Sequence, residues 1–186
     1  MAATVTKITC KFIGDFKVGD NLILNADALC KLSNGNEKGV FNKLMVIQAG
    51  SIVEAALNEI VYRAKSFTKE GVPNISKEDR DEIATKTVEK FNVIIDVMKK
   101  YKILDGLGAA TVYDELHKLR KYRNKVHIQT DVDIQGVSRD EPAAFSKTIV
   151  DWSLELTVRV LNHLNATYPR PKELEQYAHE LSIPSS

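Results

Sequence analysis

The spacing of apolar side chains constrains the fold of this chain more than any other feature. Residues 40–67 carry a wide apolar stripe, and residues 76–104, 111–127 and 142–167 carry further stripes. Spacings of three and four place side chains on one face of an α-helix. Four long amphipathic helices with connections of moderate length predict an all-α fold, an up-down helical bundle. The helix at 40–67 is expected to lie centrally because its stripe is wide.

The two ends of the chain follow other patterns. Residues 4–12 alternate apolar and polar side chains, which indicates a short strand or an ordered arm, since one strand cannot be stable alone. A short helix is expected from Asp20 to Leu32, a second at residues 172–182, and a frayed end at 183–186. The predicted organisation is an N-terminal arm and short helix (1–39), the bundle (40–168), and a short C-terminal helix with its tail (169–186).

Composition limits the classes of function. The 186 residues include 26 Lys and Arg against 25 Asp and Glu, so a broad basic surface for nucleic acid is excluded and any polyanion contact must be local. Two cysteines show no metal-ligand spacing and indicate a reducing compartment. The N-terminus lacks the apolar core of a signal peptide, and the apolar runs are shorter than a membrane span. These features predict a soluble cytoplasmic protein.

Polar groups that can carry chemistry gather at the end of the helix expected at 111–127. On a helical wheel at roughly 100° per residue, four of them lie within an arc of roughly 100°. They are Arg120, Arg123, Asn124 and His127. The arc borders the apolar seam formed by Val112, Leu116, Leu119 and Val126, whereas Lys118, Lys121 and Lys125 are expected to face solvent. Charged groups at such an edge are oriented and partly desolvated, which strengthens contacts with anions.

An arginine and a histidine in this arrangement suit phosphoryl transfer on RNA. Histidine titrates near neutral pH and can exchange a proton with a ribose hydroxyl or a leaving oxygen. Arginine offers a fixed fork of donors to a phosphate that develops charge. RNA supplies its own nucleophile, the 2′-hydroxyl. The spacing alone equally describes a solvated helix edge with a cationic last turn.

The segment Leu-Arg-Lys-Tyr-Arg-Asn-Lys-Val-His, residues 119–127, resembles the terminal motif of the HEPN superfamily. Those domains are helical bundles in which four to six residues separate an arginine, typically followed by Asn, Asp or His, from a histidine. Arg123, Asn124 and His127 match this pattern, although only three residues separate Arg123 from His127. Counting from Arg120 gives six, but Lys121 is then the wrong follower. Arg120 is therefore expected to be a supporting phosphate contact, and Asn124 a substrate contact.

The resemblance implies a homodimer in which two motifs face each other. It implies metal-independent RNA cleavage with 2′,3′-cyclic phosphate ends, Arg123 and His127 as catalytic residues, and no cofactor. It also implies a setting in toxin–antitoxin or antiviral defence, with an antitoxin or another defence protein as a partner and no membrane. One alternative is a catalytically inactive HEPN-like module that binds RNA, nucleotide or a protein. Another is a helical interaction protein without a nucleic-acid role.

Two carboxylates within the apolar stripe of residues 40–67 leave two interpretations open. Glu54 and Glu59 either lie at the solvated edge of the stripe, or one of them points inward and pairs with an arginine. The remaining histidines are interpreted more simply: His117 as an exposed polar residue, His163 as a satisfied helix-face residue, and His179 as part of the tail. Tyr113, Tyr122 and Trp152 are expected to pack in the core.

Overall fold

The computed structural model describes residues 4–67, 69–126 and 137–185. The chain is mostly helical and carries one small two-stranded sheet, so the prediction of a purely helical fold is only partly confirmed. The α-helices are α1 (Phe16–Asn34), α2 (Asn42–Ser66), α3 (Lys77–Thr85), α4 (Phe91–Lys100), α5 (Ala109–Asn124), α6 (Glu141–Ala144) and α7 (Lys147–Thr167). Short 3₁₀ turns span Glu37–Gly39, Asp105–Leu107 and Lys172–Tyr177. The strands are β1 (Val5–Cys10) and β2 (His179–Pro184).

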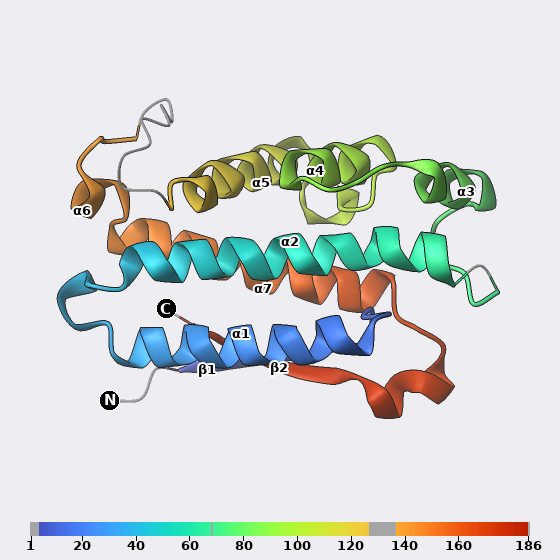
Figure 1. The fold of residues 1–186 in the computed structure, drawn as a ribbon, viewed down its shortest axis with the longest axis horizontal. Coiled ribbons are helices and arrows are strands. Elements are labelled where there is room, and N and C mark those ends of the chain that lie inside the picture. The colour runs from blue at the N-terminus through green and yellow to red at the C-terminus, as the bar shows by residue number, and fades with distance from the viewer. Residues whose placement is uncertain (1–3, 68, 127–136, 186) are drawn as a thin grey trace.

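The elements form three layers around a central pair of helices, α2 and α7 (Figure 1). Helices α3, α4 and α5 cover one side of this pair, and α1 with the β1–β2 sheet covers the other. Helix α2 is the longest element and contacts α1, α3, α4, α5 and α7. The central position predicted from the wide apolar stripe of residues 40–67 is confirmed, since α2 buries side chains against both outer layers.

Helix α2 is also long and apolar enough to cross a membrane, judged by length and composition alone. In the folded chain, 61% of its most apolar window is buried inside the protein. Its buried side chains, including Val46, Val53, Leu57 and Ile60, belong to a single hydrophobic core that also takes in residues of β1, β2 and the other long helices. These contacts are those of a central core helix.

The two ends of the chain pair with each other. Strand β1 runs antiparallel to β2, from Val5 opposite Pro184 to Cys10 opposite His179. The predicted short C-terminal helix at 172–182 and the frayed end after it are therefore wrong. Residues 179–183 alternate, with Leu181 and Ile183 fully buried, and this period of two supplies the partner that the strand at 4–12 lacked in the sequence.

The helix predicted at residues 76–104 is two helices. Helix α3 begins after Ser76, whose side chain accepts a hydrogen bond from the Asp79 backbone N–H at 3.0 Å, as its capping signal predicts. It ends at Thr85, and Lys86 and Lys90 both have extended backbone angles. Thr87 and Val88 are β-branched and favour an extended chain. The freed carbonyl of Lys86 accepts a hydrogen bond from Lys65 Nζ at 2.7 Å.

The other helix boundaries lie close to the predicted ones. Helix α1 starts earlier than expected, because Asp15 rather than Asp20 caps it by accepting from the Lys17 N–H at 2.8 Å. The helix predicted after Asp140 is interrupted at Phe145 and Ser146, which separate α6 from α7. The predicted division into three segments stays a prediction, although buried side chains from all three lie in one core.

Candidate functional site

The predicted site lies at the end of α5, and α5 is positioned by its apolar seam. Val112, Leu116 and Leu119 are fully buried, and Tyr122 is nearly so. Helix α5 contacts α2 and α4, and side chains of α5 also reach α7, where Tyr122 packs beside Trp152. The predicted burial of these three seam residues is confirmed, and Tyr113 and Tyr122 pack in the core as expected. The packing fixes the direction in which the last turn of α5 presents its polar side chains.

Arg123 is held against α2. Its Nη2 donates a hydrogen bond to Glu54 Oε2, forming an ion pair between the two helices. Its Nη1 lies 3.4 Å from Asn124 Oδ1. The Arg123 side chain keeps 35% of its surface exposed, so the guanidinium is anchored at one edge and open to solvent at another. An arginine held in this way is oriented for an incoming anion.

Gly50 allows this close approach of α5 to α2. A Cβ atom at position 50 would lie 2.9 Å from Arg123 Cβ and 3.2 Å from Arg123 Cγ. No larger residue fits without moving the arginine. Gly50 is therefore a point of close packing between α2 and α5.

Of the two predicted alternatives, a solvated carboxylate or one paired with an arginine, the second describes Glu54. Burial raises the pKa of Glu54, and the charge and hydrogen bond of Arg123 partly offset this rise. Glu54 also lines a hollow of about 200 Å³ together with Ser51, Asn58 and Glu89. The carboxylate thus lies between the guanidinium of Arg123 and this hollow. It can orient Arg123 and can exchange a proton with a group bound beside it.

The other predicted site residues are placed as follows. Arg120 is half-buried, and its Nε is buried without a hydrogen-bond partner in the described part of the chain. Asn124 is exposed and is the last residue of α5. His127 lies outside the described residues. The structure therefore brings Arg123, Asn124 and Glu54 together and leaves the position of the histidine as a prediction.

Two assignments on the helical wheel are wrong. Lys125 was expected in solvent but is buried, and its Nζ donates to the Ser138 carbonyl at 3.1 Å. Val126 was expected in the apolar seam but is exposed. The cause is the end of α5 at Asn124, since Lys125 already has non-helical backbone angles and the wheel no longer applies. Lys118 is exposed as predicted, with its Nζ 4.6 Å from the centre of the Trp152 ring.

The remaining histidines carry no comparable cluster. His117 is half-buried rather than exposed, with its Nε2 3.7 Å from Asp96 Oδ1. Burial lowers the pKa of His117, and the charge of Asp96 partly offsets this effect. His163 Nε2 lies 2.8 Å from the Ile103 carbonyl, as expected for a satisfied histidine. Within the described ranges, no group of three or more His, Cys, Asp or Glu side chains could hold a metal ion.

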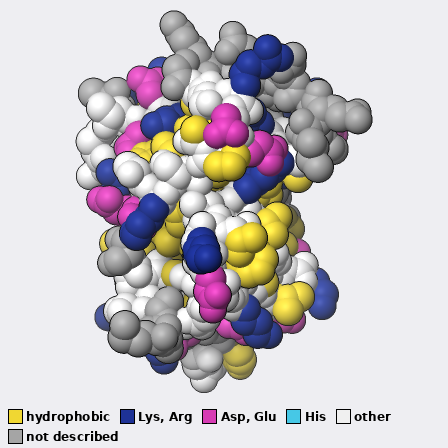
Figure 2. Space-filling model, turned by 90° about the vertical axis from the view of Figure 1, so that its left-hand side faces the viewer, with side chains coloured by type: hydrophobic (Ala, Val, Ile, Leu, Met, Phe, Trp, Pro, Cys, Tyr) yellow, Lys and Arg dark blue, Asp and Glu magenta, His cyan; other side chains and the backbone are white. Residues whose placement is uncertain are grey.

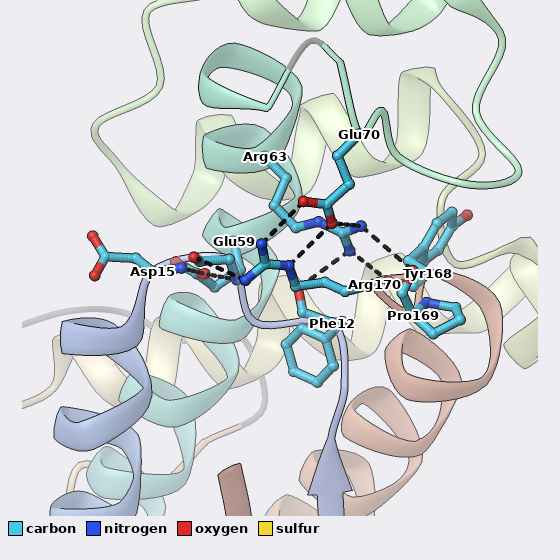
Figure 3. A network of polar contacts seen from close by, with 9 residues as sticks. Phe12, Asp15, Glu59, Arg63, Glu70, Tyr168, Pro169 and Arg170 are labelled. Carbon is cyan, nitrogen blue, oxygen red and sulfur yellow. Dashed lines mark hydrogen bonds and ion pairs between the residues drawn. The ribbon is translucent and has the colours of Figure 1, made fainter. Parts of the chain in front are cut away.

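A second polar cluster, which the sequence did not reveal, lies at the other end of α2 (Figure 3). Arg63 is fully buried and donates to the backbone carbonyls of Phe12 at 3.2 Å and Tyr168 at 2.5 Å. Glu59 accepts from the backbone N–H groups of Gly14 and Asp15 at 2.7 and 3.0 Å. The one sequence feature that could have indicated this cluster is the spacing of Glu59 and Arg63, two charged residues four apart on the apolar stripe of residues 40–67.

No protein-family model, curated protein or solved structure matches this chain.

Proposed function

We propose that this chain is a metal-independent endoribonuclease of HEPN type, built on an up-down helical bundle, in which Arg123 and His127 act on the scissile phosphate. The observation that carries the proposal is the anchoring of Arg123: Glu54 holds one edge of its guanidinium while another edge stays open to solvent. Such an arginine is oriented before substrate arrives, which is the condition for stabilising charge in a transition state.

The proposed reaction needs no nucleophile from the protein. The 2′-oxygen of the RNA attacks the adjacent phosphorus, and the bond from phosphorus to the 5′-oxygen breaks. The 2′-hydroxyl loses a proton and the departing 5′-oxygen gains one, which leaves a 2′,3′-cyclic phosphate and a 5′-hydroxyl. In a homodimer two copies of His127 are present, so one can accept a proton while the other donates one.

The other polar groups of α5 would bind the substrate. Arg120 has an unused buried donor at Nε, and Asn124 is exposed at the helix end beside Arg123. Figure 2 shows the end of the molecule at which α5 ends; its described side chains mix both signs of charge with hydrophobic groups. Local donors rather than a broad basic surface would therefore bind the RNA, in keeping with a net charge of +1.

Assembly as a homodimer belongs to the same proposal. Val40 and Leu44 at the start of α2, and Val126 just after α5, are exposed apolar side chains. The ends of α2 and α5 that carry them lie at the same end of the molecule (Figure 1). Contact between two copies there would bring two α5 ends together. We further propose a cytoplasmic toxin–antitoxin or antiviral defence system, with an antitoxin or another defence protein as the further partner.

One observation favours a second function, a catalytically inactive HEPN-like module that binds RNA, nucleotide or a protein. Glu54 already neutralises the charge of Arg123, and a substrate phosphate would have to compete with this carboxylate. In such a module the ion pair would serve to join α5 to α2.

The test is incubation of RNA with the purified protein in EDTA, with the cleaved ends identified by mass. We expect cleavage with 2′,3′-cyclic phosphate ends. His127→Ala should slow it by about 10²–10⁴-fold, and Arg123→Ala by about 10²–10³-fold. His117→Ala, on the same helix, and Arg159→Ala, which removes another ion-paired arginine, are the matched controls and should retain activity.

Other outcomes separate the two functions. RNA binding that Arg123→Ala weakens, without any cleavage, would support the inactive module and exclude the ribonuclease. Cleavage that EDTA abolishes would exclude the metal-independent mechanism. If the chain neither binds nor cleaves RNA, the ribonuclease and the RNA-binding form of the inactive module are both excluded.

A further inference from the structure

A pocket of about 430 Å³ lies between the loop after α2 and the turn after α7, away from the end of α5. Four cationic side chains line it, Lys77, Arg80, Arg170 and Lys172, against a single carboxylate, Glu70. A protein with a net charge of +1 thus concentrates positive charge at one concave place. Concave surfaces with one sign of charge attract and hold small ions of the opposite sign.

The carboxylate of Glu70 cannot balance this charge. Arg170 binds both of its oxygens, with Nε and Nη2 each 3.0 Å from a carboxylate oxygen. Arg63 Nη2 lies 3.6 Å from Glu70 Oε1, so two guanidinium groups share one carboxylate (Figure 3). Arg63 is fully buried, and burial lowers its pKa to about 10. Glu59 also acts on Arg63 through its charge, while its carboxylate accepts hydrogen bonds from two backbone N–H groups, so Glu70 and Glu59 together face the two guanidinium groups.

The two lysines of the pocket have no ion-pair partner in the described part of the chain. Lys77 and Lys172 are exposed, and neither forms an ion pair with any residue in the described ranges. Arg80 is engaged by Asp81 at 3.0 Å. Two ammonium groups without an ion-pair partner in the described part of the chain therefore line the same space as two ion-paired guanidinium groups. An anion bound there would meet several donors at once.

The rest of the lining is apolar. Val72, Pro73, Ile75, Pro169 and Pro171 form its walls. The volume lies in the range of pockets that enclose small organic ligands. We propose that this pocket binds a small phosphate monoester whose body is apolar, with the phosphate against Lys77, Lys172 and the guanidinium of Arg170. This binding goes beyond the proposed ribonuclease activity and does not depend on it.

The test is calorimetric titration of the full chain with phenyl phosphate, with inorganic phosphate and glucose 6-phosphate as comparison ligands. Phenyl phosphate should bind saturably and about tenfold more tightly than glucose 6-phosphate, since only its ring fits the apolar walls. The paired variant Lys77→Glu with Lys172→Glu should weaken this binding by about tenfold or more. Both side chains are exposed, so the melting temperature should change little.

The control is Lys31→Glu with Lys99→Glu, which changes the net charge by the same amount at exposed positions on α1 and α4. Binding by this variant should stay within about twofold of the unmodified chain at moderate salt. Equal losses in both paired variants, or no saturable binding by the unmodified chain, would overturn the proposal. Equal affinity for phenyl phosphate and glucose 6-phosphate would overturn the assignment of an apolar body.

Discussion

Glu59 shows how a single buried charge joins segments that are distant in the sequence. It is 2% exposed, and its Oε2 accepts from the backbone N–H groups of Gly14 and Asp15, just before α1 begins. The sequence predicted either a solvated carboxylate or one paired with an arginine. Neither describes Glu59 fully, because the pattern of side chains in a sequence does not show which backbone N–H groups of a distant segment will become donors. Glu54 could be anticipated better, since its partner Arg123 is a side chain of opposite charge.

Glu59 should make stability depend on pH in a definite direction. Burial raises the pKa of Glu59 above its usual value of 4.5, and the backbone N–H donors oppose this only in part. The folded state therefore holds the proton more tightly than the unfolded chain does. This contribution to stability is present below about pH 4.5 and is lost as the pH rises through the folded pKa.

The measurement is the free energy of unfolding in urea, from about pH 4 to about pH 7, for the unmodified chain and Glu59→Gln. As the pH rises, the unmodified chain should lose stability relative to the variant. Glu173→Gln, which alters an exposed carboxyl on the turn at 172–177, controls for the change in net charge. A difference that stays flat, or that grows in the opposite direction, would show that Glu59 does not titrate in this way.

At the scale of the element, local pattern predicted the helices better than their ends. The seam of α5 and the central place of α2 follow from spacing alone, because a helix must bury its apolar stripe. The break between α3 and α4 could not be fixed in this way, since the apolar stripe continues on both sides of it. Strand β2 was missed because its partner is at the other end of the chain, and a strand without a visible partner gives a weak signal.

The contact between α2 and α5 gives a prediction about Gly50. Gly50→Ala places a methyl group 2.9 Å from Arg123 Cβ, so α5 must shift away from α2. We expect a loss of about 1–3 kcal/mol in the free energy of unfolding, together with a weaker contact between Glu54 and Arg123. Urea unfolding measures the first effect. The rate of RNA cleavage at saturating substrate reports the second if the proposed activity holds.

Gly35→Ala is the control for this prediction. Gly35 follows α1 with a negative φ, and a Cβ atom there would lie 3.4 Å from the Phe41 ring, an ordinary contact. Its effect should stay within about 0.5 kcal/mol. Equal stability of the Gly50→Ala and Gly35→Ala variants would mean that α5 moves freely over α2.

At the scale of the whole molecule, the three layers share one core. Side chains from β1 and β2, such as Ile8 and Leu181, lie in the same hydrophobic cluster as Leu116 of α5 and Leu161 of α7. The sequence predicted a bundle at 40–168 flanked by an N-terminal segment (1–39) and a C-terminal segment (169–186). The common core indicates that removing either end would expose apolar surface of the central helices.

The chain should therefore unfold in one cooperative transition. Trp152 reports on the contact between α7 and α5, because its Nε1 donates to Glu115 Oε1 at 3.1 Å. Far-ultraviolet circular dichroism reports on all helices. The two signals should give the same midpoint in urea. Leu181→Ala, a substitution in β2, should lower both midpoints together and cost about 2–5 kcal/mol. A Trp152 signal that stays unchanged in this variant would show that the sheet unfolds as a separate unit.

The pairing of β1 with β2 also sets an order of events during synthesis. The residues of β2 are translated almost at the end of this sequence, whereas those of β1 are translated near its start. At about 5–20 residues per second, β1 would wait roughly 10–30 s for its partner. Ile8 and Cys10 are buried in the finished fold, but during this interval they have no strand beside them. The apolar face of β1 therefore stays unpaired until the residues of β2 have been synthesised.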